Sequence, residues 1–201
     1  MQEPRRIVVA LTGASGAPYF LRLLQRIRAV DNVAVHLVAS EGGKRVLQEE
    51  SKMHWQDLPL DGIATVEGIA TVEGITSVSN KNIGASIASG SCRLHGMVVL
   101  PCSMNTLSCI ASGIANTLIL RCAAVQLKED RKLILAVRET PLSLINLRAM
   151  TSLREAGAVI LPASPGFYQD PKTIDDLLDT VIDRIFDHLN LDDPTIKRWN
   201  P

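Results

Sequence analysis

Short apolar runs alternate with longer amphipathic stretches along most of this chain, and no other feature of the sequence constrains the fold as strongly. The runs are rich in Val, Ile and Leu, as strands buried on both faces of a parallel sheet are. Strands are predicted at Ile7–Leu11, Val33–Val38, Met97–Leu100, Leu133–Val137 and Val159–Leu161. Helices are predicted at Ala17–Val30, Glu41–Glu50, Asn105–Ser112, Asn116–Lys128, Ser143–Glu155 and Ile174–Leu189. This order predicts an α/β fold with a three-layer, doubly wound, mostly parallel sheet of the Rossmann-like or flavodoxin-like kind.

The length and the charge balance limit what such a fold can bind. The chain has 201 residues, of which 46% are hydrophobic, so we predict a single domain over residues 1–201 with one well-buried core. Its 21 Lys and Arg residues balance 21 Asp and Glu residues, so no overall field attracts nucleic acid or an anionic membrane. An anionic ligand must therefore be held by local groups.

Neither the cysteines nor the histidines have the spacing of a metal site. The four cysteines include no CxxC pair, so we expect reduced thiols in a cytoplasmic protein. The four histidines share no ligand spacing, and no metal is predicted. Arg5 and Arg6 precede an apolar run shorter than the ~7 to 15 residues of a signal-peptide core. No segment approaches the ~20 apolar residues of a membrane span.

One segment departs from the alternation. Gly62–Glu67 is repeated without change as Gly68–Glu73, and a third, partial copy begins at Gly74. Two copies are too few for a solenoid, which needs roughly three repeats or more. We interpret Gly62–Thr76 as a local duplication in a variable connection, which can hold one short strand near Ile75–Val78.

Two glycine- and hydroxyl-containing turns follow predicted strands. Thr12–Gly16 lies directly between a strand and a helix, where free helix N–H groups favour a phosphate or a flavin edge. A tight turn without a ligand is about as common, and Ser15 could simply cap the helix. Pro101–Leu107 repeats this arrangement after another strand. Capping by Ser103 alone is the alternative there, but two such turns can face one ligand.

Basic residues occupy two places where they could hold a phosphate. Arg121 and Lys128 are seven residues apart and share one face of a predicted helix, for which a solvated surface is the more common explanation. Arg138 and Glu139 come directly after a buried strand. A charged pair at that position belongs at the mouth of the sheet.

Three further side chains are candidates for the chemistry. The loop Pro165–Pro171 presents Tyr168, which could donate a hydrogen bond to a phosphate, although loop tyrosines more often pack on the core. Arg184 on the last helix is a possible partner, or a surface residue. Glu50 near the end of the second helix could act as an acid or base, or be an exposed carboxylate.

Six motifs in sequence order make the chain resemble the UbiX-type flavin prenyltransferases. They are TGASG, SGS at Ser89–Ser91, GMVVLPCSM, NTLILR with AVQLKE, AVRETPLS, and PASPGFYQDP. The resemblance covers nearly the whole chain. It implies a metal-independent transfer of dimethylallyl from dimethylallyl phosphate to N5 and C6 of reduced FMN. It further implies a UbiD-type decarboxylase as recipient of the prenylated FMN, and a homo-oligomer, commonly a dodecamer, whose interfaces help to complete each site.

The resemblance also assigns roles to residues. It implies FMN contacts by Gly13, Ala14, Ser15, Ser40, Ser103, Met104, Asn105, Thr106, Arg121 and Arg138. It implies that Lys128, Tyr168 and Arg184 hold the donor phosphate, and that Trp199 closes over the site. The catalytic residues would be Ser15, Glu50 and Glu139, with Ser15 and Glu50 as a proton relay.

Three positions depart from the family pattern, and two other functions compete. Ala124, Asn146 and Ala149 stand where Asp, His and Asn are usual, so subunit packing can differ here. A cysteine-type FMN decarboxylase of the same fold would favour a histidine near the first helix, but no His precedes His36. A non-catalytic flavin carrier would not need the donor-phosphate residues. The choice between a monophosphate and a pyrophosphate donor stays open.

Overall fold

The computed structural model describes residues 3–58, 64–66, 69–72, 74–196 and 198. Trp199 lies outside them, as do Gly62, Ile63, Glu67, Gly68 and Glu73 of the duplicated segment.

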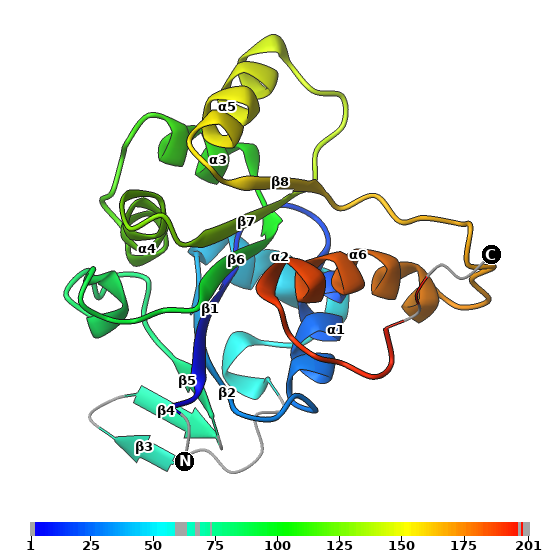
Figure 1. Cartoon of the computed structure of the whole chain (residues 1–201), viewed down its shortest axis with the longest axis horizontal. Coiled ribbons are helices and arrows are strands. Elements are labelled where there is room, and N and C mark those ends of the chain that lie inside the picture. Colours follow the sequence, from blue (N-terminus) through cyan, green and yellow to red (C-terminus); the bar gives the residue numbers. More distant parts are fainter. Residues whose placement is uncertain (1–2, 59–63, 67–68, 73, 197, 199–201) are drawn as a thin grey trace.

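An eight-stranded sheet runs through the molecule in the order β3-β4-β5-β2-β1-β6-β7-β8 (Figure 1). The strands are β1 (Arg5–Leu11), β2 (Val33–Ala39), β3 (Ala64–Val66), β4 (Ile69–Val72), β5 (Ile75–Ser77), β6 (Gly96–Cys102), β7 (Lys132–Val137) and β8 (Val159–Pro162). All neighbours from β5 to β8 pair in parallel, whereas β3 and β4 form an antiparallel edge. The predicted mostly parallel sheet is confirmed.

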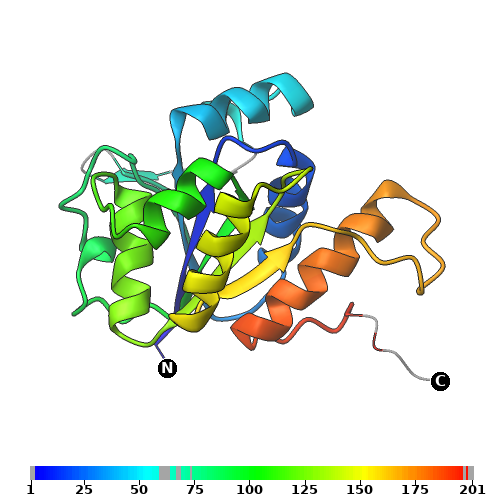
Figure 2. The ribbon, with the colours of Figure 1, turned by 90° about the horizontal axis from the view of Figure 1, so that it is seen from above.

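Helices cover both faces of this sheet and make the three layers (Figures 1 and 2). They are α1 (Ala17–Ile27), α2 (Glu41–Ser51), α3 (Met104–Ala111), α4 (Leu118–Lys128), α5 (Leu144–Glu155) and α6 (Ile174–Leu189), with short 3-10 turns η1 (Trp55–Asp57) and η2 (Ser86–Ala88). Successive β1 side chains supply two separate cores: Val9 packs with α1 and α6, and Val8 packs with α3 and α4. Burial on both faces is why β1 is a continuous apolar run.

The duplicated segment forms more strands than expected. The strand predicted near Ile75–Val78 is confirmed as β5, but β3 and β4 were not predicted. One copy of the repeat supplies β3, the next supplies β4, and the start of the third supplies β5. Val66 pairs with Ile69, and Val72 pairs with Ile75. A six-residue repeat with β-branched residues can therefore form short antiparallel strands as readily as an irregular connecting loop.

The strand order points to the ends of β1 and β6 as the place for a ligand. Numbered along the chain, the six parallel strands lie in the order 3-2-1-4-5-6, which is the Rossmann order. The order reverses at the β1–β6 pair, so the connections leave these two strands toward opposite faces of the sheet. In doubly wound sheets, ligands bind at the carboxyl ends of the strands at this reversal. Both turns singled out in the sequence lie there.

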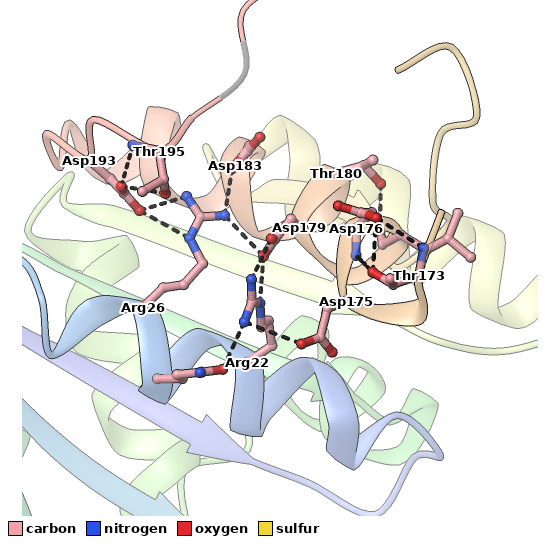
Figure 3. Close-up of polar contacts among 12 residues, drawn as sticks. Arg22, Arg26, Thr173, Asp175, Asp176, Asp179, Thr180, Asp183, Asp193 and Thr195 are labelled. Atoms are coloured by element: carbon pink, nitrogen blue, oxygen red, sulfur yellow. Dashed lines mark hydrogen bonds and ion pairs between the residues drawn. The ribbon is translucent and has the colours of Figure 1, made fainter. Parts of the chain in front are cut away.

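A buried arginine joins α1, α6 and the C-terminal segment (Figure 3). The Arg26 side chain is only 7% exposed, and its guanidinium pairs with Asp183 and Asp193 at 2.6 Å each. It also lies over the ring of Phe186, 5.1 Å from the centroid. Arg22, one turn earlier, pairs with Asp179 at 2.6 Å. These groups line a cavity of about 320 Å³, but their charges are already paired, so we assign no ligand to it.

We expect Arg26→Met to lower the free energy of unfolding by about 3–5 kcal/mol, because it leaves two poorly exposed carboxylates without their partner. Chemical denaturation monitored by circular dichroism measures the loss. Arg28→Met, at the exposed end of the same helix, is the control and should change stability by less than about 0.5 kcal/mol. Equal losses from the two variants would contradict a stabilising role for the buried pairs.

Candidate functional site

The hydroxyl of Thr12 connects the two turns at the β1–β6 reversal. Its Oγ1 donates to the carbonyl of Pro101 at 2.7 Å and accepts from the amide of Ser103 at 2.8 Å. Thr12 is 1% exposed, so both bonds are shielded from water. The β1–α1 turn and the β6–α3 turn are therefore held at a set distance from each other, with the N-termini of α1 and α3 at the same edge of the sheet.

A third turn joins them through close backbone contact. Ser40 follows β2 and caps α2 by accepting a hydrogen bond from the amide of Gly43 at 3.0 Å. A Cβ atom on Gly13 would lie 3.3 Å from the backbone of Gly42, and one on Gly43 would lie 2.5 Å from the carbonyl oxygen of Leu11. Only glycine allows the first turn of α2 to approach β1 this closely. Three helix N-termini thus lie at the carboxyl edge of adjacent strands, an arrangement that favours anions.

The N-terminus of α1 already holds a carboxylate from within the chain. Glu50 Oε2 accepts hydrogen bonds from the amides of Gly16 at 2.9 Å and Ala17 at 2.8 Å. Partial burial alone would raise the pKa of Glu50, but hydrogen bonds from Ser15 and from these two amides, with the charge of Arg138, lower it below its ordinary value. Glu50 is therefore ionised at neutral pH. Ser15 thus contributes to the environment of Glu50, and the role of the two residues as a proton relay stays a prediction.

The α3 turn and Arg138 offer another place for an anion. Ser103 caps α3 by accepting from the amide of Thr106 at 3.3 Å, and its hydroxyl lies 3.1 Å from that of Thr106. Arg138 follows β7, and its Nε donates to the carbonyl of Ser15 at 2.9 Å. Its guanidinium is thus held beside the first turn. Hydroxyls at a helix N-terminus with a nearby arginine make a phosphate-binding group.

One chain brings most of the predicted flavin residues to this edge. They are Gly13, Ala14, Ser15, Ser40, Ser103, Met104, Asn105, Thr106 and Arg138, joined by Glu50. Glu139 is the next residue after Arg138, is exposed, and accepts a hydrogen bond from the amide of Thr140 at 3.0 Å. Arg121 is exposed in the first turn of α4. The individual roles of these residues stay predictions.

The predicted donor-phosphate residues are not gathered within one chain. Lys128 ends α4 just before the start of β7, whereas Arg138 follows the end of β7. The six residues of that strand span roughly 17 Å. Lys128 therefore lies near the amino-terminal ends of the strands, whereas the turns lie near their carboxyl ends.

Tyr168 and Arg184 lie on the other face of the sheet, with α6. The amide of Gly166 donates to the hydroxyl of Thr180 at 3.0 Å, which ties the Tyr168 loop to α6 one turn before Arg184. Arg184 forms an ion pair with Asp187 at 3.0 Å. Tyr168 and Arg184 are both substantially exposed. Lys128 thus lies on a different part of the surface of one chain from Tyr168 and Arg184.

Residues central to the geometry were not assigned roles from sequence. Thr12 was seen only as part of a turn, and Gly42 and Gly43 were not singled out. A signal did exist for the glycines. Two in the first turn of a helix are unfavourable for helix formation by about 1 kcal/mol each, so their presence points to a close backbone approach.

The described part of the chain offers neither a metal site, nor a membrane span, nor a reactive thiol. No three His, Cys, Asp or Glu side chains there are placed to hold a metal ion, and none of its helices is long and apolar enough to cross a membrane. Burial raises the pKa of both Cys102 and Cys122 to about 12. Neither thiol is therefore a nucleophile at neutral pH.

Comparison with known proteins gives consistent results. A family model described as Flavoprotein matches residues 1–186. A flavin prenyltransferase UbiX from Thermoplasma acidophilum is 44% identical over 194 residues, covering 96% of this chain and 99% of the relative. The crystal structure of AnUbiX (PadA1) with FMN and dimethylallyl pyrophosphate is 40% identical, with a TM-score of 0.88 and 99% of both chains covered.

A second solved structure resembles the chain nearly as closely. It is a dodecameric FMN-dependent UbiX-like decarboxylase from Escherichia coli O157:H7, 38% identical with a TM-score of 0.87, covering 98% of this chain and 100% of that one. The predicted fold class is therefore confirmed by structures that match over nearly their full length.

We expect Thr12→Val to lower the free energy of unfolding by about 1–3 kcal/mol, because it leaves the amide of Ser103 and the carbonyl of Pro101 unpaired. Hydrogen exchange of the Ser103 amide should also become faster. Thr12→Ser is the control: it keeps the hydroxyl, so Ser103 should stay protected. Unchanged protection in Thr12→Val would show that the bridge does not hold the turns.

The stabilisation by Glu50 should depend on pH. Its folded-state pKa is lowered, so the ionised carboxylate stabilises the fold above the unfolded-state pKa and this contribution disappears as pH falls through the folded-state pKa. Glu50→Gln should therefore cost about 1 kcal/mol at pH 7, and progressively less as the pH falls below the ordinary glutamate pKa of about 4.3. Glu49→Gln, whose carboxylate forms only an exposed pair with Arg45, is the matched control. A pH-independent difference between Glu50→Gln and the unmodified protein would contradict this assignment.

Proposed function

The chain belongs to the family of UbiX flavin prenyltransferases, and from this premise we propose that it transfers the dimethylallyl group of dimethylallyl phosphate to N5 and C6 of reduced FMN. The observation that carries the proposal is the site at the β1–β6 reversal. There Ser15 stabilises an ionised Glu50, and Arg138 adjoins the N-terminus of α3, where the hydroxyl groups of Ser103 and Thr106 lie 3.1 Å apart.

We infer that the phosphate of FMN lies at the N-terminus of α3. Glu50 already occupies the N-terminus of α1, and a phosphate at the same amides would face the carboxylate. Among the described residues, no carboxylate is hydrogen-bonded to the turn from Ser103 to Thr106, and Arg138 adds a positive charge nearby. The glycine-containing turn at Gly13 then adjoins the flavin ring, because only a residue without a side chain allows a flat ligand to approach the backbone closely.

Ser15 and Glu50 suit the removal of a proton from the flavin ring. Reduced FMN supplies the nucleophilic ring atoms when it is bound. Its C6 atom loses a proton as the fourth ring closes, and Glu50, ionised at neutral pH, can receive it through the Ser15 hydroxyl. The hydrogen bonds from the Gly16 and Ala17 amides hold the carboxylate in place during this transfer.

Departure of the donor phosphate requires positively charged side chains close to it, and a single chain does not bring the predicted ones together. The C–O bond of the donor breaks as the prenyl group is transferred, and the leaving phosphate is stabilised by cations and hydrogen-bond donors. Lys128, Tyr168 and Arg184 can supply these only if surfaces of different copies meet. We therefore propose a homo-oligomer, a dodecamer as in the Escherichia coli relative, in which neighbouring copies complete each site.

Helix α5 is the part of the surface that best fits a contact between copies. Leu144, Ile145 and Leu147 are exposed on it, and exposed apolar groups of this kind often mark interfaces. Asn146, one of the departures from the family pattern, forms a capping box with Ser143 at the start of α5. Its substitution for the usual histidine thus has a local structural role, and it leaves the apolar face intact.

The product and the compartment follow from the same premise. We propose that the prenylated FMN is passed to a UbiD-type decarboxylase and that the protein works in the cytoplasm. In support of a reducing compartment, Cys92, Cys102, Cys109 and Cys122 are all free thiols.

Purified protein incubated with reduced FMN and dimethylallyl phosphate should yield a flavin heavier by C5H8, measured by mass spectrometry. A parallel incubation with dimethylallyl pyrophosphate decides which donor is used.

Arg138→Met should weaken FMN binding roughly tenfold to a hundredfold, because it removes a charged hydrogen-bonding partner. Arg28→Met, at the exposed C-terminal end of α1, serves as the control for a lost arginine. Unmodified FMN with both donors would reject the proposed function.

A further inference from the structure

The ammonium group of Lys128 is held in a network at the C-terminal end of α4. Lys128 Nζ lies 2.7 Å from Glu129 Oε1, and Glu129 Oε2 lies 3.7 Å from the guanidinium of Arg131. Exposure decreases along this series, from 59% for the Lys128 side chain to 33% for Glu129 and 20% for Arg131. The network is thus anchored at Arg131 and presents Lys128 to solvent.

Arg131 is anchored to a turn of the backbone. Its two terminal nitrogens donate to the carbonyls of Cys92 at 2.6 Å and Gly90 at 2.7 Å. Two bonds from one planar guanidinium to fixed carbonyls leave it little freedom, and a lysine could not reproduce this fork. The position of Arg131 is therefore set by the turn from Gly90 to Cys92.

Gly90 makes room for the other two side chains. A Cβ atom at this position would collide with Glu129 Oε1 and would lie 2.9 Å from Lys128 Nζ. Any larger residue would push the ion pair away from the turn. The carboxylate and the ammonium therefore lie directly against the backbone at Gly90, and their place depends on its lacking a side chain.

The position of Glu129 in helix α4 does not stabilise its negative charge. It is the C-cap residue of α4, where the helix dipole disfavours a negative charge and favours Lys128. Its carboxylate is compensated by the two cations beside it, and hydrogen bonding and charge from Lys128 lower its pKa. The three side chains together carry two positive charges and one negative charge. The network thus keeps a net positive charge while restricting where Lys128 can point.

We propose that Glu129 and Arg131 are positioning residues that hold the Lys128 ammonium over Gly90, ready for the phosphate of the prenyl donor. This inference rests on the proposed function, which assigns Lys128 to that phosphate. A lysine at an exposed helix end otherwise has four flexible side-chain bonds, and ordering such a side chain on binding costs about 0.5–1.5 kcal/mol. Holding it beforehand lowers that entropic penalty.

Glu129→Gln tests the proposal because it keeps the shape of the side chain and removes the charge. The measurement is calorimetric binding of dimethylallyl phosphate to the intact oligomer loaded with oxidised FMN, which permits binding without turnover. We expect the donor Kd to rise roughly twofold to tenfold, with the FMN Kd and the oligomer size unchanged. Asp130→Asn makes the same change of charge at the next residue, which is exposed, and should leave the donor Kd unchanged.

A double-mutant cycle separates positioning from a general structural effect. In a Lys128→Met background, Glu129→Gln should cause no further loss of donor affinity, because the group that it positions is gone. A similar loss in both backgrounds, or a donor Kd that is unchanged or lower in Glu129→Gln alone, would overturn the proposal. A lower Kd would mean that Glu129 competes with the phosphate.

The same experiment distinguishes the inference from the proposed function. If the unmodified protein binds dimethylallyl phosphate but forms no prenylated flavin with reduced FMN, the transferase function fails while the binding data still decide the role of Glu129. If the unmodified protein does not bind the donor, both are rejected.

Discussion

The shielded hydroxyl of Thr12 is the interaction on which the geometry of the site depends. A buried hydroxyl must have partners, and this one has the carbonyl of Pro101 near the end of β6 and the amide of Ser103 in the turn that follows. These bonds hold together two connections that leave the sheet toward opposite faces. The pairing of β1 with β6 brings the N-termini of α1 and α3 to the same end of the sheet, and these bonds then hold the two turns against each other. The approach of Gly42 to Gly13 adds the N-terminus of α2 to the same group.

The distribution of charge around these helix ends gives them different roles. The α1 N-terminus is occupied by Glu50, so its positive end stabilises an internal carboxylate and keeps it ionised. The α3 N-terminus has hydroxyl caps and lies near Arg138, an environment suited to an external phosphate. Two similar strand-to-helix turns thus differ in charge, and the difference comes from one residue on α2. This difference supports our proposal that the α1 turn holds a base and the α3 turn a phosphate.

The charged networks around Arg26 and Arg131 stabilise the elements that carry the predicted donor-phosphate residues. Arg26 fastens α6 and the C-terminal segment to α1, and α6 carries Arg184 and is bonded to the Tyr168 loop. Arg131 fastens the Gly90 turn to the end of α4, where Lys128 lies. In both networks, a poorly exposed guanidinium with several fixed partners supports a more exposed cation. This division would allow the exposed cations to contact other copies in the proposed homo-oligomer while the buried guanidinium groups keep their own chain folded.

The sequence by itself determined the fold class, because apolar runs buried on both faces and amphipathic helices between them leave few alternatives to a doubly wound sheet. It also located the turns, since Thr12–Gly16 and Pro101–Leu107 follow strands and begin helices. The β3–β4 hairpin was missed because a six-residue β-branched repeat is compatible with either a strand or a variable connection. Only the tertiary structure decided that Glu50 fills the α1 N-terminus, that Thr12 joins two turns 89 residues apart, and that Lys128 lies across the sheet from Arg138. The physical reason is that these relations depend on strand order and on the direction of helices, which bring together or separate residues regardless of their distance along the chain.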